Sequence, residues 1–314
     1  MLQASRRPLI YAGGGVINGD AADELRRFAD HFGIPVTTTL MGIGAVDTRQ
    51  PLSLHMLGMH GLASANYAVE DCDFLIAVGA RFDDRVAGVP DKFAPKTRHI
   101  AQFDIDPSEI GKVKAIDWFH VGVLKQDLKA VHDYGVRHHI APDFSAWHRE
   151  IADLKSTYAL NFDRDSEMIQ PYAVIETINA ITQGDAIIST GVGQHQLWAA
   201  QYFDFSNPRL WLTSGSMGTM GFGLPAAIGA QFANPVVAAR LRGVTVVLDA
   251  GHGGQDVGAS VKGTWESLYV YDIMVRTKNL LEGNTAAEVV PTTRDGSRFQ
   301  VPDKDKLPTS RGHR

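Results

Sequence analysis

Glycine-rich stretches follow several predicted strands, and such stretches let a phosphate or a flat ring approach the backbone closely. Gly13–Gly15 comes after the apolar run Pro8–Ala12 and before a predicted helix, whose first amides could bind an anion. A ligand-free turn explains these three glycines equally well, because GGG is not the GxGxxG pattern of dinucleotide sites. We therefore treat this stretch as one candidate cofactor contact among several.

A third predicted strand end carries charged side chains beside a glycine, in the sequence GARFDDR at 79–85. Charged groups are costly to bury without partners, so these either form a surface network of ion pairs or line a polar cleft. In a cleft, an arginine guanidinium would bind or stack on a planar anionic cofactor. Asp104 and Asp106, at the next strand end, could accept hydrogen bonds from ribose hydroxyls.

The second half of the chain has a comparable pair of runs, TGVGQH at 190–195 and LTSGSMGTMGFGLP at 212–225. Each follows a predicted strand, and the second leads into an alanine-rich helix. Such runs allow a diphosphate or a ring to lie against backbone amides. Close packing of helices would also explain the glycines without any ligand.

A further strand end, VVLDAGHGG at 246–254, places a histidine before two glycines. His252 is a plausible zinc ligand, and Glu266, at the start of the next predicted helix, could reach the same ion. A purely structural histidine is the simpler explanation of GHGG alone. A catalytic zinc needs three protein ligands and an open position, so two candidates do not complete such a site.

Composition restricts the class of protein. The 314 residues are enough for two domains, and 44% hydrophobic with 21% charged residues is typical of a soluble globular protein. The formal charge of −5 argues against a nucleic-acid partner, and no run approaches the roughly 20 apolar residues of a membrane helix. We expect a cytoplasmic protein whose single cysteine, Cys72, is a buried small hydrophobe.

Strands and helices are predicted to alternate in the first third of the chain. The predicted helix at Asp20–Phe32 has apolar residues at helical spacing and is stopped by Gly33. A further helix is expected to open at Asp106. The predicted strands are Pro8–Ala12, Ile34–Leu40, Phe74–Val78 and His99–Ile105. This alternation predicts an α/β fold with a doubly wound parallel sheet.

The pattern changes twice further along. It weakens after residue 138, where we expect a connection with one exposed helix at Ser145–Leu160, and a second α/β unit begins with a helix at Pro171–Ile181 and a strand at Ala186–Thr190. A third unit has a strand at Val244–Asp249, a helix at Glu266–Leu281 and a charged tail without stable structure. The expected division is a domain at 1–140, a linker at 141–170, a partial domain at 171–238 and a truncated segment at 243–314.

The first half resembles the central, FAD-binding domain of acetolactate synthase large subunits. The motifs that carry the resemblance are RRPLIYAGGGVI, TTTLMGIGAV, PLSLHMLGMHG, DFLIAVGARFDDRVAG and FDIDPSEIGK. The resemblance implies a Rossmann-like domain with an extended, largely structural FAD, and a substrate channel that opens near Met59 and Arg85. The residues it places at the flavin are Gly13, Gly14, Thr39, Leu40, Gly58, Met59, His60, Gly79, Arg81, Asp83, Arg85 and Asp104. A later acidic residue of the family is not evident around His120–Val123.

The runs at 190–195 and 212–225 resemble the start of the thiamine diphosphate domain of the same family. The resemblance implies that Val192, Gly193, Gln194 and His195 contact the diphosphate and the reacting centre. It also implies that Gly218 contacts the aminopyrimidine and that Met220 holds the cofactor bent, with Gln194, His195 and Met220 as catalytic residues. The implied reaction is condensation of pyruvate with a second 2-keto acid in the synthesis of isoleucine, valine and leucine.

Two parts of that family are not found in the sequence. The magnesium-binding GDG motif does not follow Pro235, and the amino-terminal pyrimidine domain is missing. We therefore expect the isolated chain to make no acetolactate and to retain at most partial affinity for FAD. The resemblance implies a homo-oligomer, with a regulatory small subunit as a further partner.

The last segment resembles the start of zinc-dependent N-acetylmuramoyl-L-alanine amidases, through VVLDAGHGGQDVGA, YVYDIMVRTKNLLE and VVPTTRD. That resemblance implies zinc at His252 and Glu266, and cleavage of peptidoglycan. Three hypotheses follow: a fragment of a thiamine-dependent carboligase, a fragment of a zinc hydrolase, or a non-catalytic FAD-binding remnant from a chimeric or misassembled gene.

Overall fold

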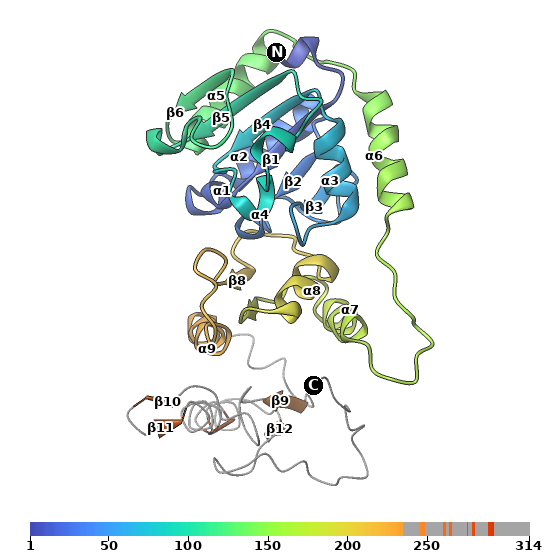
Figure 1. Ribbon diagram of the computed structural model, residues 1–314, viewed down its shortest axis with the longest axis vertical. Coiled ribbons are helices and arrows are strands. Elements are labelled where there is room, and N and C mark those ends of the chain that lie inside the picture. The colour runs from blue at the N-terminus through green and yellow to red at the C-terminus, as the bar shows by residue number, and fades with distance from the viewer. Residues whose placement is uncertain are drawn as a thin grey trace. The chain divides into compact units, whose positions relative to one another are not determined.

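The computed structural model describes residues 1–234 and, beyond them, residues 245–248, 260–261, 264–265, 275, 278–279 and 288–291. The chain divides into two compact units, Met1–Ala227 and Ile228–Arg314 (Figure 1). The first unit contains a large parallel sheet followed by a smaller α/β part. Nearly all of the predicted site residues lie in this unit.

The large sheet of the first unit has six strands in the order β3-β2-β1-β4-β5-β6, and every neighbouring pair is parallel. Its strands are β1 (Pro8–Ala12), β2 (Val36–Thr38), β3 (Ser53–Met56), β4 (Phe74–Val78), β5 (His99–Asp104) and β6 (Trp118–Val121). The order reverses at β1, because the chain adds β2 and β3 on one side and β4 to β6 on the other. The predicted doubly wound parallel sheet is confirmed.

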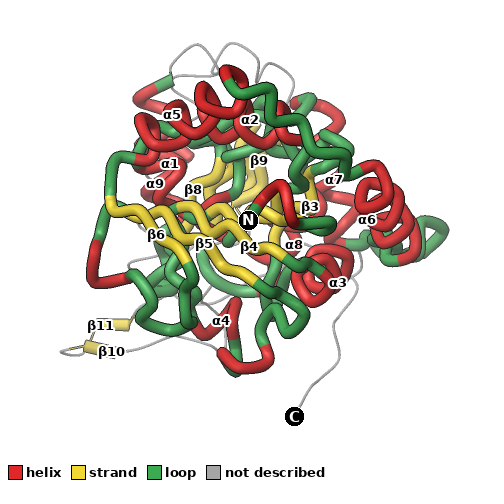
Figure 2. The backbone as a smooth tube through the Cα atoms, turned by 90° about the horizontal axis from the view of Figure 1, so that it is seen from above, coloured by secondary structure: helices red, strands yellow, loops and turns green. Residues whose placement is uncertain are grey.

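Helices cover both faces of this sheet. They are α1 (Gly14–Asn18), α2 (Ala22–Phe32), α3 (Ala63–Asp71), α4 (Asp84–Ala87), α5 (Leu124–Arg137) and α6 (Ser145–Thr157). Figure 2 shows α2 and α5 on one face and α3 and α4 on the other. All five residues of β1 and of β4 are buried, because strands covered on both faces can carry continuous apolar sequence.

The helix α2 forms as its sequence pattern predicts. Leu25, Phe28, Ala29 and Phe32 lie on its buried face, and the helix ends at Gly33. Gly33 has φ +63°, a left-handed conformation that a residue without a Cβ adopts at little cost. The helix therefore begins two residues later than expected and ends where predicted.

Other elements differ from the prediction. The helix expected at Asp106 is a single 3-10 turn, η4 (Pro107–Glu109), in which the Asp106 carboxylate accepts a hydrogen bond from Ser108 N. The Asp106 carboxylate thus satisfies the first free amide of this turn. The turn has no apolar face to pack, and it ends after one turn. The strand β6 and the helix α5 follow it. The resemblance implies a strand end near residues 120–123, but the sequence pattern predicted neither element, and all four residues of β6 are exposed.

The helix predicted after residue 138 is present as α6, but the prediction that it is exposed is wrong. Trp147 and Ile151 of α6 are each only 1% exposed, and Trp147 Nε1 donates a hydrogen bond to Pro8 O at 2.9 Å. The ring of His148 also lies 2.7 Å from Gly33 O through Nε2. The helix is thus part of the packing of the large-sheet domain and contributes its own apolar stripe to that core.

The smaller α/β part of the first unit begins at α7 (Pro171–Thr182), as predicted. Its further elements are β7 (Ile188–Thr190), α8 (Gln194–Tyr202), β8 (Trp211–Thr213) and the start of α9 (Gly223–Ala233). The strands β7 and β8 pair in parallel, with Ser189 opposite Leu212. A second apolar cluster holds this part together, and it includes Phe203, Phe205 and Trp211.

In the second unit, β9 (Thr245–Leu248) pairs in parallel with β12 (Glu288–Pro291), and β10 (Ser260–Val261) pairs antiparallel with β11 (Thr264–Trp265). The strand β9 lies within the predicted strand, and positions 275, 278 and 279 are helical within the predicted helix. The candidate zinc ligands His252 and Glu266 and the tail from residue 292 lie outside the described residues. Among the residues that are described, no helix is long and apolar enough to cross a membrane.

The burial of Trp147 leads to a stability prediction. Replacing Trp147 with Ala should lower the free energy of unfolding by about 3–5 kcal/mol, because the substitution leaves a large cavity and removes a hydrogen bond to Pro8 O. Trp147→Phe keeps most of the packing and should cost less. The control Trp118→Ala removes a side chain that is 42% exposed and should cost about 1 kcal/mol. Urea unfolding measures all three, and equal losses for Trp147→Ala and Trp118→Ala would contradict the packing of α6.

Candidate cofactor sites at the strand ends

The carboxyl ends of the central strands lie along one edge of the large sheet and are joined there by backbone hydrogen bonds. Gly13 N donates to Val78 O at 2.9 Å, and Gly79 N donates to Phe103 O at 2.9 Å. These bonds extend the parallel ladder beyond β1, β4 and β5. The loops after these strands are therefore neighbours, as expected for the edge of an open parallel sheet where ligands bind.

The glycines at this edge allow two loops to touch. A Cβ on Gly13 would lie 2.1 Å from Gly79 O, and one on Gly15 would lie 2.7 Å from Gly79 Cα. Gly79 itself has φ +57°. Close packing of the two backbones therefore requires a glycine at position 13 even without a ligand. This agrees with the ligand-free explanation of Gly13, and its role at a cofactor stays a prediction.

The loop that carries Arg81, Asp83 and Arg85 is held by a buried aromatic residue. Phe82 has φ +55°, unusual for a bulky side chain, and its ring packs 5.3 Å from that of Tyr11 and 6.0 Å from that of Phe93 between centroids. This packing compensates the strained backbone and fixes the residues on either side. The loop is therefore rigid at its base.

The charged side chains of this loop lie at the surface. Arg81 and Arg85 are exposed, and the Asp83 side chain accepts a hydrogen bond from Arg85 N at the start of α4. Arg85 Nε lies 3.9 Å from Asp84 Oδ2, but these side chains are 73% and 83% exposed, so the pair is strongly screened. Instead of an extended network, the described part of this loop has one loose ion pair, which leaves the guanidinium groups open to an anionic ligand.

The loop after β3 contacts the same region. Met59 N donates to Arg85 O at 2.9 Å, and a Cβ on Gly58, whose φ is +97°, would lie 2.8 Å from that oxygen. Asn66 fixes Gly58 from the other side, since its side chain both accepts from Gly58 N and donates to Gly58 O. Met59 is 64% exposed, and His60 is exposed beside it. The structure therefore brings the predicted residues at 58–60 next to Arg85.

The loop after β2 completes this edge. Thr39 N donates to Ala12 O at 2.9 Å, and the Thr39 hydroxyl accepts a hydrogen bond from Gly42 N, which caps the 3-10 turn η2 (Leu40–Gly42). Met41 of this turn is exposed, and its Cβ lies 3.0 Å from the position of a Cβ on Gly14. Predicted flavin residues from four strand ends thus line one edge of the sheet.

Asp104 and Asp106 differ in environment. Asp104 is buried at the end of β5, and its Oδ1 accepts a hydrogen bond from Asp106 N at 3.0 Å. Burial raises the pKa of the Asp104 carboxyl, and the backbone bonds only partly offset this. Asp106 is exposed, and its hydrogen bonds from Ser108 lower the pKa of its carboxyl.

A carboxylate near the end of β6 was not predicted from the sequence. Asp127, in the first turn of α5, has Oδ1 3.2 Å from His120 Nε2, and its Oδ2 is buried without a hydrogen-bond partner among the described residues. A Cβ on Gly122 would lie 2.6 Å from this Oδ2. Asp127 therefore places a carboxylate from the following helix beside the end of β6. Only the fold reveals this, since nothing in the local sequence links Asp127 to the strand end.

The smaller sheet has its own pair of glycine-rich loops. Gly193, with φ +147°, precedes α8, and Gln194 and His195 are exposed in the first turn of this helix. Beneath them, the Thr213 hydroxyl lies 2.9 Å from that of Thr190 and accepts a hydrogen bond from Gln196 Nε2 at 2.7 Å. These buried bonds fix both strand ends below the helix terminus, where free amides favour an anion.

The second loop packs closely on the first. A Cβ on Gly223 would lie 2.5 Å from Gly191 N, and one on Gly218 would lie 4.0 Å from Val192 Cγ1. Gly218 has φ +63°, and Met220 is 71% exposed. The structure therefore brings Val192 and Gly218 together and leaves the Met220 side chain free to contact a ligand.

The described residues contain no group of three or more His, Cys, Asp or Glu side chains that could hold a metal ion. Near the smaller sheet the carboxylate of Asp204 is already engaged, since it accepts a hydrogen bond from Asn179 Nδ2 at 2.8 Å. The donors at α8 fit the anionic diphosphate of thiamine diphosphate. They do not supply carboxylates for the magnesium ion that the resemblance implies.

A depression of about 170 Å³ lies away from both edges, beside α2 and α5. It is lined by Glu24, Arg27, Lys129, His132 and Asp133. None of these residues was predicted to contact a cofactor, and they belong to helices on the face of the sheet. This depression therefore gives no support to the predicted sites.

Two family models match separate parts of the chain. Residues 1–131 match the family described as "Thiamine pyrophosphate enzyme, central domain", and residues 191–254 match "Thiamine pyrophosphate enzyme, C-terminal TPP binding domain". The second match includes the GHGG run at 251–254. The comparisons give no support to the resemblance to amidases.

The chain is also similar to curated acetolactate synthases. It is 49% identical over 249 residues to acetolactate synthase 1, chloroplastic, of Oryza sativa subsp. japonica. The aligned region covers 77% of this chain and 36% of that protein. It is 47% identical over 235 residues to the acetolactate synthase large subunit of Parasynechococcus marenigrum (strain WH8102), covering 75% of this chain and 38% of that one. The chain thus spans between a third and two fifths of the length of these relatives.

The two carboxylates at the end of β5 lead to a prediction of opposite pH dependence. The pKa of Asp104 is raised in the folded state, so its contribution to stability is full below the unfolded pKa of about 4 and is lost as the pH rises through the folded pKa. The unfolding free energy of the wild type relative to Asp104→Asn should therefore fall as the pH rises above about 4. The pKa of the Asp106 carboxyl is lowered in the folded state. The unfolding free energy of the wild type relative to Asp106→Asn should therefore rise as the pH rises.

Thermal unfolding of both variants between about pH 3 and pH 7 measures these slopes. Each variant is the control for the other, because the two side chains lie on the same loop. Slopes of the same sign would contradict the difference in burial.

Proposed function

We propose, for a chain that belongs to the acetolactate synthase family of thiamine pyrophosphate enzymes, that its first unit carries parts of two cofactor sites. The edge of the large sheet binds FAD, and the glycine-rich loops of the smaller sheet bind thiamine diphosphate. The observation that carries this proposal is that loops from four strand ends touch one another at one edge, through the backbone bonds of Gly13, Thr39, Met59 and Gly79.

The chemistry of this edge fits a flavin dinucleotide. The exposed guanidinium groups of Arg81 and Arg85 suit an anionic diphosphate, and the exposed thioethers of Met41 and Met59 suit a flat, largely apolar ring system. The buried carboxylate of Asp104 suits ribose hydroxyls, which donate hydrogen bonds. FAD contains all three kinds of group.

Asp127 supports the adenosine end of the same site. Its free carboxylate oxygen lies beside Gly122, and Gly122 N donates to Asp104 O at 3.0 Å, so the two carboxylates belong to neighbouring strand ends. A buried acceptor without a partner is costly, and a hydroxyl or amino group of a ligand would satisfy it. We assign Asp127 the place of the acidic residue that is not evident at 120–123.

The loops of the smaller sheet support thiamine diphosphate. The amides at the start of α8 would bind the diphosphate, with His195 beside them, while Gly218 and Met220 would lie against the aminopyrimidine and the bend of the cofactor. When bound, thiamine diphosphate supplies the means to decarboxylate a 2-keto acid. The chain's own residues bind and orient the cofactor.

The activity we propose for the protein is condensation of pyruvate with a second 2-keto acid, in branched-chain amino-acid synthesis. Since the matched region is 36% of the rice relative, this activity, the homo-oligomer, the regulatory small subunit and the cytoplasmic location are proposals for the whole protein. The magnesium ion belongs to the same proposal.

FAD binding to the purified chain tests the proposal. Arg81→Gln should weaken binding about tenfold, because one charge-assisted hydrogen bond to a phosphate contributes roughly 1.5 kcal/mol. Arg98→Gln is the matched control: Arg98 is also exposed but directly precedes β5, at the opposite edge of the sheet. Quenching of flavin fluorescence measures the affinity.

The proposal predicts that the wild type and Arg98→Gln bind with the same affinity. Absence of saturable binding by the wild type, or equal weakening by both substitutions, would rule out a flavin site at the carboxyl edge.

A further inference from the structure

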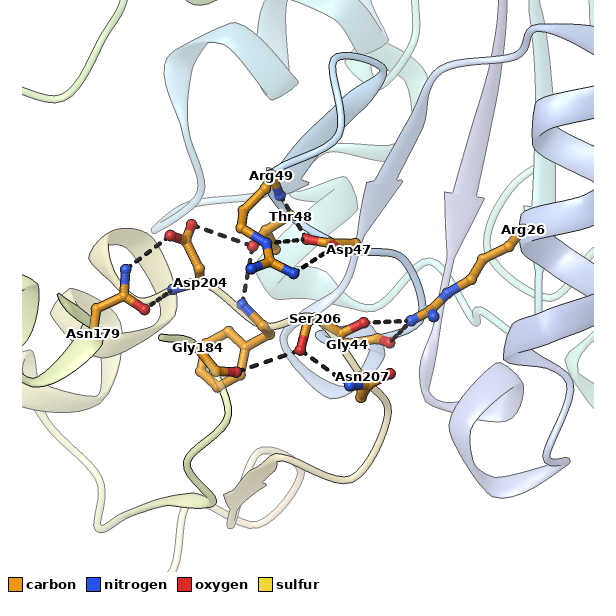
Figure 3. Close-up of polar contacts among 11 residues, drawn as sticks. Arg26, Gly44, Asp47, Thr48, Arg49, Asn179, Gly184, Asp204, Ser206 and Asn207 are labelled. Carbon is orange, nitrogen blue, oxygen red and sulfur yellow. Dashed lines mark hydrogen bonds and ion pairs between the residues drawn. The ribbon is translucent and has the colours of Figure 1, made fainter. Parts of the chain in front are cut away.

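Two segments that are distant in the sequence are paired inside the first unit (Figure 3). The first, which we call the strap, comprises residues 43–49 and follows the turn η2. The second, the return loop, comprises residues 203–208 and leads from α8 to β8. The strap belongs to the FAD-binding part in our proposal, and the return loop belongs to the thiamine part.

Arg26 of α2 binds both segments at once. Its Nε donates to Ala45 O at 2.9 Å, and its Nη2 donates to Gly44 O at 2.9 Å and to Ser206 O at 3.0 Å (Figure 3). A planar guanidinium offers several donors in fixed directions, so it can hold three carbonyl groups in one geometry. A side-chain amide, with only two N–H donors, could not replace all three bonds.

Backbone contacts continue from this point. Thr48 N donates to Phe205 O at 3.2 Å, and Phe205 N donates to the Thr48 hydroxyl at 3.0 Å. Asp204 is tied to α7, because its amide and its carboxylate each pair with the side-chain amide of Asn179. The return loop is thus bound on one side to the strap and on the other to the first helix of the thiamine part.

Close approach of the two segments depends on a glycine. Gly44 has φ +90°, and a Cβ on it would lie 2.5 Å from Asn207 O. Apolar side chains fill the space behind: Ile43 and Met56 are buried in the same cluster as Phe205. The pairing is therefore a packed contact with specific hydrogen bonds.

The strap is continuous with one predicted cofactor loop, the turn η2, and this turn contacts the other. It follows directly from η2, whose Met41 lies against the glycine-rich run after β8, since a Cβ on Gly215 would lie 2.3 Å from Met41 Sδ. The position of η2 relative to that run is consequently set by the residues that hold the strap. Arg26 is the only one of these described residues whose side chain bonds to both the strap and the return loop from a third element.

We propose that Arg26 is a positioning residue that fixes the turn η2 against the glycine-rich run after β8, and so couples the FAD site to the thiamine diphosphate site without contacting either cofactor. The names of the two ligands rest on the function proposed above. The mechanical link itself rests on the hydrogen bonds of Arg26 and Thr48 and on the close approach at Gly44.

Hydrogen exchange of the full chain tests the link without any ligand. Arg26→Gln should raise amide exchange about tenfold or more in residues 39–48 and 203–208 together, because both segments lose the same anchor. Arg27→Gln is the matched control, since Arg27 is the next residue of α2 and bonds only to Glu24 on its own helix among the described residues. Faster exchange in α2 alone, or in only one of the two segments, would overturn the proposal.

A second pair of variants tests the same link through the backbone. Gly44→Ala should raise exchange in the same two segments, because the new Cβ clashes with Asn207 O. Gly88→Ala is its control: Gly88 also has a left-handed φ, +55°, but a Cβ there meets nothing within 4 Å. If Gly44→Ala and Gly88→Ala raise amide exchange in the strap equally, backbone strain explains the result and the link is refuted.

Flavin binding separates the link from the proposed function. In the wild type, FAD should bind, and Arg26→Gln should weaken its affinity about fivefold although Arg26 lies outside the site, while Arg27→Gln leaves it unchanged. No FAD binding by the wild type refutes the proposed function, and the exchange experiment still decides the link. Unchanged affinity in Arg26→Gln, with faster exchange of the strap, refutes the coupling between the sites.

Discussion

The burial of a parallel sheet on both faces is the constraint on which the rest of this structure depends. With β1 and β4 entirely buried, the sheet offers polar backbone to a ligand only where its strands end. The ends of β1, β4 and β5 are tied together by the hydrogen bonds of Gly13 and Gly79, and Thr39 ties the loop after β2 to the end of β1. Every predicted flavin residue lies at or shortly after the end of one of the strands β1 to β5.

The glycines at this edge show that one residue type can serve packing and binding at the same time. Gly13 and Gly58 are required because backbone carbonyls of Gly79 and Arg85 occupy the place of a side chain. Loops that approach so closely leave little room to rearrange, and they hold their outward side chains in fixed positions. A preformed surface of this kind binds a large cofactor at a lower entropic cost than flexible loops would.

Close backbone packing at a glycine also joins the two α/β parts of the first unit. The strap and the return loop are joined by Arg26, Thr48 and Gly44, and an apolar cluster lies behind them. Both parts fall within one compact unit, Met1–Ala227. A change in the packing of the return loop would therefore reach the turn η2.

The parts of the fold that sequence predicted well are those that local pattern determines. The strands β1 and β4 are continuous apolar runs, and α2 has an apolar face and a terminal glycine, so each was predicted almost to the residue. The strand β6 was not among the strands predicted from the sequence pattern, and the helix expected at Asp106 was reduced to one turn. In these cases the surrounding structure, and not the local sequence, decides the conformation.

Of the residues that sequence missed, one acts at short range along the chain and the other at long range. Asp127 lies beside Gly122 because α5 begins directly after the end of β6, and Arg26 reaches Ser206 across a separation of 180 residues. Neither belongs to a motif. The motif residues Gly13, Arg81, Asp104 and His195 could be predicted from resemblance, but their roles at a cofactor stay predictions.

The central claim is that the carboxyl edge of the large sheet binds FAD. Hydrogen exchange of the full chain, with and without saturating FAD, tests it most directly, because it reports where the ligand lies. The account predicts protection in the segments at 13–15, 39–42, 58–60, 79–85 and 104–106, and none in the helix α2 or in the part of α5 that follows its first turn. Protection confined to the depression lined by Glu24 and His132, or no protection anywhere, would contradict it.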